Sequence, residues 1–156
     1  FPQQGLLSFK FWSEDFFLVS HRDRVPQAVD GIGLNEINPA ELMLLDEGHC
    51  LTGQALELCR IAVESVINTG GSSLTTLIGL VGCKLGQTLV PEMALASLVS
   101  VNPVLTTSRL EEPGPHREIA LLARPNYDSI ASIELLRDFF SDCLIKARET
   151  FPSREQ

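Results

Sequence analysis

Short apolar runs alternate along the chain with longer stretches in which apolar residues recur every three or four positions. Short runs are typical of buried strands, and the longer period is typical of helices. The runs predict strands over 9–12, 16–20, 42–45, 64–68, 88–91, 104–110 and 119–125. The spaced stretches predict a helical turn over 35–40 and helices over 51–60, 74–85, 92–98 and 129–148. Strands that alternate with helices indicate an α/β domain with a mostly parallel sheet.

Two of these helices carry the clearest boundary signals. The helix that starts near residue 74 follows a Thr-Gly-Gly-Ser-Ser turn, in which Ser73 is a good N-cap residue. Its apolar stripe is Leu74, Leu77, Ile78, Val81 and Leu85, and Gly86 is expected to end it. The last helix is capped by Asp128 or Ser129, and its apolar face comprises Ile133, Leu136, Phe140, Leu144 and Ala147.

Composition and charge narrow the classes of protein. A length of 156 residues fits one domain, or one domain and a fragment. The formal net charge of −8 argues against nucleic-acid binding by this stretch itself. No run approaches the roughly 18 apolar residues of a membrane-spanning helix, so no membrane partner is expected. The N-terminus has neither a signal-peptide pattern nor an initiator Met, and we therefore expect that the chain was cut from a longer one.

The four cysteines indicate free thiols. In a chain without a signal peptide they are typical of a reducing compartment, so a cytoplasmic protein is expected. No CxxC or HxxxH spacing indicates zinc, and neither a metal nor another cofactor is expected. Cys83 lies inside an apolar helix and is expected in the core, whereas Cys143 is expected to be a bystander. His21 and His116 are expected in surface loops.

The strongest chemical signal lies where the run 42–45 leads into a Gly-His-Cys turn. Cys50 stands between a predicted strand and the first turn of the predicted helix 51–60. Unpaired backbone N–H groups and the positive end of the helix dipole converge at such a position. They stabilise a thiolate, lower the pKa of the thiol and make the sulfur nucleophilic at neutral pH. His49 can add a positive charge or a hydrogen bond.

A second cysteine nine positions later suggests a switch. Nine residues of helix correspond to a rise of about 13 Å and a rotation of about 180°. A disulfide requires Cα atoms roughly 4.4 to 6.8 Å apart. Cys50 and Cys59 therefore cannot bond across an intact helix, and a bond between them would unwind it. The alternative is that both are buried, inert thiols, since free Cys is among the most buried residue types.

One group of motifs surrounds Cys50: Leu-Met-Leu-Leu-Asp-Glu-Gly-His-Cys-Leu over 42–51, Gln54-Ala55 and the spacing to Cys59. Others follow: Ser-Leu-x-Thr-Leu over 73–77, Gly-x-Thr-Leu-x-Pro over 86–91 and Pro-His-Arg-x-Ile-x-Leu over 115–121. With these motifs the chain resembles the sensing segment of OxyR-type peroxide sensors, which are LysR-family transcriptional regulators. The similarity extends from about Phe9 to the last helix. The Gly-His-Cys turn with its second cysteine is specific, and the rest is general to LysR-type effector domains.

The resemblance implies a role for each residue of the site. Cys50 would be the peroxidatic cysteine that hydrogen peroxide oxidises to sulfenic acid, and Cys59 would be the resolving cysteine that closes a disulfide. The surroundings of the thiolate would be His49, Gly48, Thr52 and Arg117. Arg117 would keep the sulfur ionised and stabilise charge on the departing oxygen. Thr52 and Gly53 stand where the family usually has a charged pair, which affects peroxide sensitivity.

The resemblance also implies an architecture. The fold would be α/β, a Rossmann-like effector domain similar to type 2 periplasmic binding proteins, here lacking the first part of subdomain I. Residues 1–13 would be the remainder of subdomain I and the crossover, 14–118 subdomain II with the redox cysteines, 119–148 the closing strand and helix of subdomain I, and 149–156 a tail. The apolar surface that the missing part normally covers would then be exposed.

The expected function is therefore that of a redox-sensing regulatory domain of a LysR-type activator, not an enzyme. The implied partners are hydrogen peroxide, further copies in a dimer or tetramer, a cellular dithiol reductant, and DNA through an absent N-terminal winged helix-turn-helix. One alternative is a LysR-type effector domain that binds a small organic co-inducer, with incidental cysteines. A thiol peroxidase is disfavoured because the Thr-x-x-Cys pattern of peroxiredoxins and any CxxC are absent.

Overall fold

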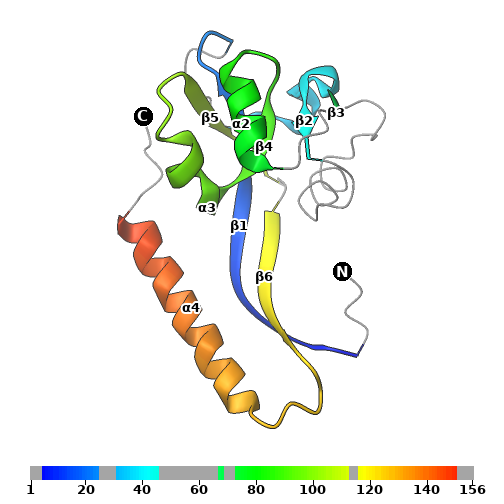
Figure 1. Cartoon of the computed structure of the whole chain (residues 1–156), viewed down its shortest axis with the longest axis vertical. Coiled ribbons are helices and arrows are strands. Elements are labelled where there is room, and N and C mark those ends of the chain that lie inside the picture. Colours follow the sequence, from blue (N-terminus) through cyan, green and yellow to red (C-terminus); the bar gives the residue numbers. More distant parts are fainter. Residues whose placement is uncertain (1–4, 25–30, 46–66, 69–72, 113–115, 151–156) are drawn as a thin grey trace. The chain divides into compact units, whose positions relative to one another are not determined.

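The structure is a computed structural model, and it describes residues 5–24, 31–45, 67–68, 73–112 and 116–150 (Figure 1). The chain forms two compact units. One comprises Phe1–Glu14 and Arg117–Gln156, and the other comprises Asp15–His116. The chain thus passes between the units twice, after Glu14 and before Arg117. The boundaries of the family's subdomains stay a prediction.

The strand β1 (Leu7–His21) is the central strand of the unit 15–116. It pairs with β4 (Thr88–Pro91) on one side and with β5 (Leu105–Arg109) on the other, and Leu18 lies opposite both Leu89 and Ser108. Both pairings are antiparallel, so the expectation of a mostly parallel sheet is wrong for these strands. The pair of β2 (Met43–Leu44) and β3 (Ile67–Asn68) is parallel, as expected.

Both faces of this sheet are covered, which explains the uninterrupted apolar run in the second half of β1. Alternate residues of a strand point to opposite faces. Phe16 and Leu18 belong to one buried cluster, and Val19 belongs to another. The first cluster also holds Ile37, Leu42, Leu44, Leu89 and Leu110. The second also holds Met43, Leu45, Leu77, Ile78, Val81, Val90, Leu95, Val99 and Leu105.

The helix α2 (Leu74–Gly82) begins as predicted and ends early. The side chain of Ser73 accepts a hydrogen bond from the Thr76 backbone N–H at 3.2 Å. The expected end at Gly86 is wrong, because Cys83 is the C-cap and Lys84 takes the left-handed conformation that reverses the chain (φ 65°). Leu85 lies beyond the helix and is 59% exposed, so it does not belong to the buried stripe.

Short helical turns fill the rest of the unit 15–116. The predicted turn over 35–40 consists of two 3-10 turns, η1 (Leu34–Glu36) and η2 (Pro39–Glu41). The predicted helix over 92–98 consists of α3 (Glu92–Ala94) and a π-helical turn, η4 (Leu95–Val99). The strand predicted over 88–91 is confirmed, and the one predicted over 104–110 is β5.

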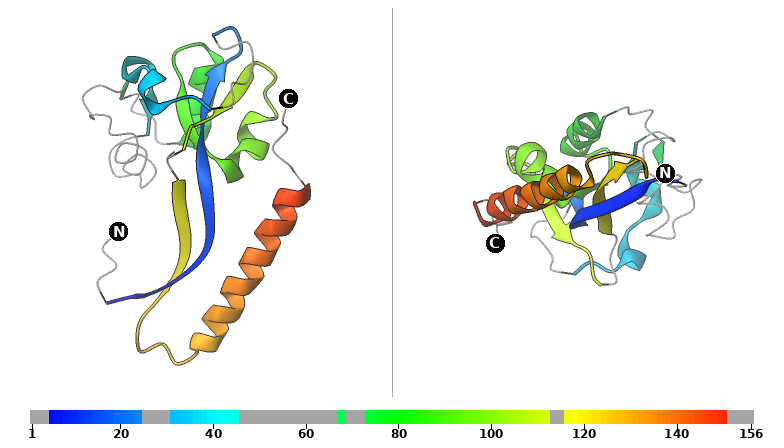
Figure 2. Two further views of the ribbon diagram at one scale, coloured as in Figure 1. Left: turned by 180° about the vertical axis from the view of Figure 1, so that it is seen from behind. Right: turned by 90° about the horizontal axis from the view of Figure 1, so that it is seen from below.

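The other unit contains the first half of β1, the strand β6 (His116–Ala123) and the helix α4 (Ile130–Thr150). The strand β6 pairs with β1, and α4 lies alongside them in both views of Figure 2. The expectation of a buried strand is wrong, since Ala123 is the one buried residue of β6. No helix among the described residues is long and apolar enough to cross a membrane.

The apolar face predicted for the last helix is present but is not buried. No residue of α4 from 130 to 148 is classed as buried, and Leu136 and Phe140 keep 44% and 37% of their surface exposed. The ring of Phe140 contacts that of Phe11 on β1, with 5.7 Å between centroids. The outer side of the helix adds Leu135 and Phe139, which are 72% and 59% exposed. Apolar side chains on both sides of α4 are therefore exposed.

Candidate functional site

Most of the predicted site lies outside the described residues. This holds for Gly48, His49, Cys50, Thr52 and Cys59. The structure describes the strands that enter and leave their segment, and it describes Arg117. Arg117 can therefore be placed, and so can the two strands that flank the segment carrying the other five residues.

Hydrogen bonds to the start of β4 hold the strand that enters the cysteine segment. The backbone N–H of Met43 donates to the Gln87 carbonyl at 2.8 Å, and the Gln87 N–H donates to the Glu41 carbonyl at 2.9 Å. The hydroxyl of Thr88, which is fully buried, donates to the Met43 carbonyl at 2.8 Å. Because all three bonds join residues 41–43 to residues 87–88, the entry to the segment is anchored to the start of β4.

The strand that leaves the segment pairs with the strand that enters it. Met43 lies opposite Ile67 and Leu44 opposite Asn68, in parallel. Parallel neighbours need a crossover of a dozen or more residues, usually a helix. The predicted helix 51–60 fits that requirement, although it lies outside the described residues. A change of shape within this crossover would act between two fixed ends.

Arg117 forms an ion pair with a buried carboxylate. Its Nε–H donates to Oε1 of Glu14 at 2.6 Å, and a terminal nitrogen of the guanidinium also lies 2.6 Å from that oxygen. The Glu14 side chain is fully buried, and 19% of the Arg117 side chain is exposed. Glu14 lies on β1 and Arg117 on β6, at the two points where the chain passes between its units. A buried carboxylate needs such a partner, because its desolvation is costly.

Glu14 is not among the residues predicted from the sequence, although the sequence carries a signal for its burial. Glu14 precedes Phe16 and Leu18 at intervals of two, and all three are buried. Alternation along a strand therefore places the carboxylate on the same face as two core side chains. A single acidic residue in phase with an apolar face indicates a buried, paired charge.

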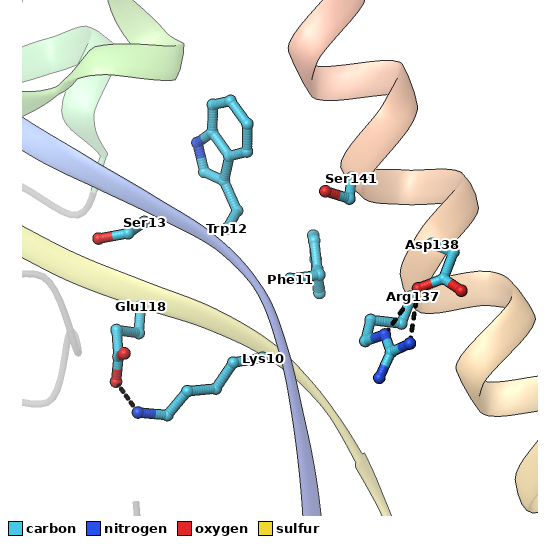
Figure 3. A pocket seen from close by; sticks show the side chains of 8 residues that line it. All are labelled: Lys10, Phe11, Trp12, Ser13, Glu118, Arg137, Asp138 and Ser141. Atoms are coloured by element: carbon cyan, nitrogen blue, oxygen red, sulfur yellow. Dashed lines mark hydrogen bonds and ion pairs between the residues drawn. The ribbon is translucent and has the colours of Figure 1, made fainter.

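A pocket of about 450 Å³ lies in the unit formed by β1, β6 and α4 (Figure 3). Its lining residues are Lys10, Phe11, Trp12, Ser13, Glu118, Arg137, Asp138 and Ser141. Lys10 pairs with Glu118, and Arg137 pairs with Asp138 at 2.7 Å. Both cations are thus neutralised by carboxylates of the same pocket, which disfavours an anionic ligand. Arg117, the predicted site residue that the structure describes, is not among these lining residues.

Two other expectations about reactive residue types are wrong. Cys83 is exposed, because it follows the last turn of α2 instead of lying inside the helix. His21 is 7% exposed at the end of β1, where its Nδ1 accepts the Asp23 backbone N–H at 3.1 Å. His116 is exposed, as expected, but it begins β6 and does not lie in a loop. Cys143 is exposed on α4.

One carboxylate in the unit 15–116 has a perturbed acidity. A hydrogen bond from Lys84 and the charge of Lys84 hold the pKa of Asp23 below its usual value, with a smaller contribution from His21. The Asp23 side chain is well exposed, so this pair supports the reversed chain after α2 and does not form a reactive site. Within the described ranges, no group of three or more His, Cys, Asp or Glu side chains could hold a metal ion.

A family model described as the LysR substrate binding domain matches residues 1–143. The chain belongs to this family. The finding confirms the predicted fold class, a mixed α/β regulatory domain of the LysR type. It also confirms the family that the Gly-His-Cys segment and its neighbouring motifs indicated.

Relatives of this LysR-type domain include regulators with two kinds of name. The chain is 36% identical over 134 residues to a probable hydrogen peroxide-inducible genes activator of Streptomyces viridosporus, over 85% of the chain and 43% of that protein. It is 31% identical over 140 residues to the HTH-type transcriptional regulator EstR of Acinetobacter baylyi, over 88% of the chain and 46% of that protein. The chain thus spans less than half of each relative.

Solved structures of OxyR proteins share the fold of this LysR-type domain. A cysteine-to-serine mutant of Corynebacterium glutamicum OxyR with hydrogen peroxide bound matches 97% of the chain and 50% of its own length, with 28% identity and a TM-score of 0.85. The reduced OxyR regulatory domain of Pseudomonas aeruginosa matches 92% of the chain and 69% of its own length, with 27% identity and a TM-score of 0.78. The match lies in the regulatory domain.

Proposed function

We propose that this chain is the peroxide-sensing regulatory domain of a LysR-type transcriptional activator. Hydrogen peroxide oxidises Cys50, and a disulfide from Cys50 to Cys59 is the conformational switch. The observation that carries the proposal is the match, over nearly the whole chain, to an OxyR structure with hydrogen peroxide bound. The spacing of the two cysteines in this sequence supports it.

The chemistry requires two steps and two thiols. The Cys50 thiolate attacks one peroxide oxygen, the O–O bond breaks, and the other oxygen takes a proton and leaves as water. The Cys59 thiol then attacks the sulfenic sulfur, the S–O bond breaks, and a second water leaves as the disulfide forms. A dithiol reductant reverses the oxidation by exchange. Each signal consumes one peroxide, so the domain acts as a sensor and not as an enzyme.

The surrounding residues would make the first step fast. His49 and the backbone near Gly48 would stabilise the thiolate, and Thr52 would contact the peroxide. Arg117 would donate hydrogen bonds to the departing oxygen, where negative charge develops. The supports described above agree with a switch, because β2 and β3 fix the ends of the crossover whose interior must rearrange.

The wider setting follows from the same proposal. Residues 14–118 would form subdomain II, and residues 1–13 with 119–148 would belong to subdomain I. The domain would work as a dimer or tetramer in the cytoplasm. DNA would be bound by an N-terminal winged helix-turn-helix, and disulfide formation would change its grip by rearranging the subunits.

The test is intact mass and peptide mapping after one equivalent of hydrogen peroxide. Cys83 and Cys143 are both exposed, so a Cys83→Ser/Cys143→Ser background removes competing thiols. We expect a Cys50–Cys59 disulfide in this background. With Cys59→Ser added, we expect a sulfenic acid on Cys50 that dimedone traps. If Cys50 reacts no faster than a free thiol and no such bond forms, the redox proposal fails.

The similarity to EstR, whose name does not mention peroxide, keeps one second candidate open. The chain would then be a LysR-type effector domain that binds a small organic co-inducer, and the cysteines would be incidental. A Cys50→Ser/Cys59→Ser variant distinguishes the two. A ligand that raises its melting temperature as much as that of the parent would favour the co-inducer, provided that the parent also fails the peroxide test.

A further inference from the structure

The pocket lined by β1, β6 and α4 combines aromatic surface with charges of both signs (Figure 3). Its volume of about 450 Å³ lies in the range of roughly 300–1,000 Å³ that small-molecule sites occupy. Phe11 and Trp12 supply the aromatic surface, and the hydroxyls of Ser13 and Ser141 add neutral hydrogen-bonding groups. All the lining residues belong to the unit that contains α4, so this unit forms the pocket by itself.

The charges of the pocket form two ion pairs that a ligand can open. These pairs are Lys10 with Glu118 and Arg137 with Asp138, and each of the four side chains keeps at least 35% of its surface exposed. Exposed pairs contribute little to stability, so a ligand that brings its own charges loses little by contacting or separating them. A ligand with one charge meets a repelling group in each pair. A ligand with both charges meets an attracting group for each of them.

The pair of Arg137 and Asp138 suits two opposite charges that lie close together. The Nε and one terminal nitrogen of Arg137 lie 2.8 and 2.7 Å from Oδ1 of Asp138. A guanidinium has five N–H donors and a carboxylate has two oxygens, so this contact leaves donors on Arg137 and an oxygen on Asp138 for a ligand. An α-amino acid carries its ammonium and its carboxylate on one carbon atom. The two groups can therefore contact Asp138 and Arg137 at the same time.

The aromatic side chains favour a ring in the rest of the ligand. The Phe11 ring packs against the ring of Phe140, with 5.7 Å between centroids, and the guanidinium of Arg148 lies 5.8 Å from the centroid of the Trp12 ring. These contacts orient both rings, and both side chains are only half-buried. The accessible part of each ring can stack with an aromatic group or meet its edge. The pocket therefore favours an aromatic zwitterion over an aliphatic one.

We propose that this pocket binds a small zwitterion with an aromatic ring, of the class of the aromatic α-amino acids. The carboxylate of the ligand lies against Arg137, its ammonium against Asp138, and its ring against Phe11 and Trp12. The site consists of residues other than those of the cysteine segment. The inference therefore does not depend on the proposed redox function.

Trp12 provides the measurement, because it is the single tryptophan of the chain and it lines the pocket. Its fluorescence is followed while L-phenylalanine is added, since phenylalanine does not absorb where tryptophan is excited. Phenylacetate, which has only the negative charge, and phenethylamine, which has only the positive charge, serve as matched probes. We expect a saturable change with phenylalanine and about tenfold weaker binding of either single-charge probe, because each lacks one charge-assisted hydrogen bond.

Two variants test the assignment of the charges. Arg137→Gln removes the partner of the carboxylate, so phenylalanine should bind about tenfold more weakly and lose its advantage over phenethylamine. Asp138→Asn removes the partner of the ammonium, so phenylalanine should lose its advantage over phenylacetate. Glu134→Gln is the matched control, because Glu134 lies on the same helix and does not line the pocket, and it should leave binding unchanged. Circular dichroism confirms that each variant is folded.

The titrations can overturn the proposal in two ways. A change in Trp12 emission that does not saturate, or equal affinity for all three probes, would show that the pocket does not recognise a zwitterion. Selectivity that stays the same in Arg137→Gln and in Asp138→Asn would show that this ion pair does not hold the ligand. Binding that Glu134→Gln weakens as much as Asp138→Asn does would overturn the proposal as well, because the net charge of the helix would then be the cause.

Discussion

Gly86 gives the sharpest prediction about the framework of the site. It lies two residues before the strand β4, where the chain runs against η2 and β2. A Cβ atom at position 86 would lie 2.5 Å from the Glu41 carbonyl oxygen and 3.1 Å from Cγ of Met43. Contacts this short with backbone do not occur in folded proteins, so Gly86→Ala must push the two segments apart.

The hydrogen bonds at this contact set the size of the effect. Moving the segments apart stretches the bond from Gln87 to Glu41 at 2.9 Å and the bond from Met43 to Gln87 at 2.8 Å. Overpacking of a well-packed site costs about 1–3 kcal/mol, and each weakened hydrogen bond costs about 1 kcal/mol. We expect Gly86→Ala to lower the free energy of unfolding by about 2–4 kcal/mol. That is a large share of the roughly 5–15 kcal/mol of a typical domain.

Gly79→Ala is the matched control. Gly79 is exposed within α2, and a Cβ atom there would meet nothing within 4 Å. Alanine is a better helix former than glycine, so we expect Gly79→Ala to raise the free energy of unfolding by about 0.5–1 kcal/mol.

Urea unfolding followed by circular dichroism measures both variants, with the midpoint compared at unchanged slope. A midpoint for Gly86→Ala at or above that of the parent would refute the reasoning. A similar decrease in the free energy of unfolding of both variants would refute it too, because the clash at position 86 would then not be the cause.

Three further predictions concern other contacts. Thr88→Val removes the buried hydroxyl that donates to the Met43 carbonyl, and we expect the free energy of unfolding measured with urea to fall by about 1–3 kcal/mol. An unchanged free energy of unfolding would show that this hydrogen bond does not stabilise the fold. The hydrogen bond from Lys84 lowers the pKa of Asp23, so the ionised carboxylate stabilises the folded state. This contribution is complete above the ordinary carboxyl pKa of about 3.9 and is lost as the pH falls through the lowered pKa. In Asp23→Asn the urea midpoint of unfolding should therefore decrease less than in the parent when the pH is lowered below about 4. An equal decrease in both proteins would contradict this. Phe139→Glu should reduce self-association in sedimentation velocity at little cost in stability, because this ring is 59% exposed on α4; unchanged association would show that this face does not drive it.

The exposed apolar side of the unit containing α4 bears on how the domain should be handled. Leu135, Leu136 and Phe139 are 72%, 44% and 59% exposed. A two-stranded ribbon with one helix buries little apolar surface, and such units are marginal unless more strands or helices pack against them. Assays of Cys50 therefore need a check of oligomeric state at the working concentration.

Several local features could be predicted because their causes are local. The strand 88–91 follows a turn and ends at a proline. Ser73 caps the N-terminus of α2, which begins at the next residue. The apolar run 16–20 predicted a strand, and the structure buries that strand on both faces, with Phe16 and Val19 in two different clusters. The end of α2 could not be predicted in this way. Gly86 was expected to end the helix. It is instead needed because the chain passes close to Glu41, and Lys84 is the residue that reverses the chain after α2.

The sequence by itself determined the family and the candidate chemistry, because the spacing of Cys50 and Cys59 and the Gly-His-Cys turn are properties of neighbouring residues. Only the tertiary structure decided the antiparallel direction of β1 against its neighbours, the pairing of Glu14 with Arg117, and the exposure of α4. The physical reason is that periodicity shows which side of an element is apolar, whereas its partners are chosen by chain segments far away in sequence. A charge such as Glu14 acquires its role only when a strand more than one hundred residues later brings it a guanidinium.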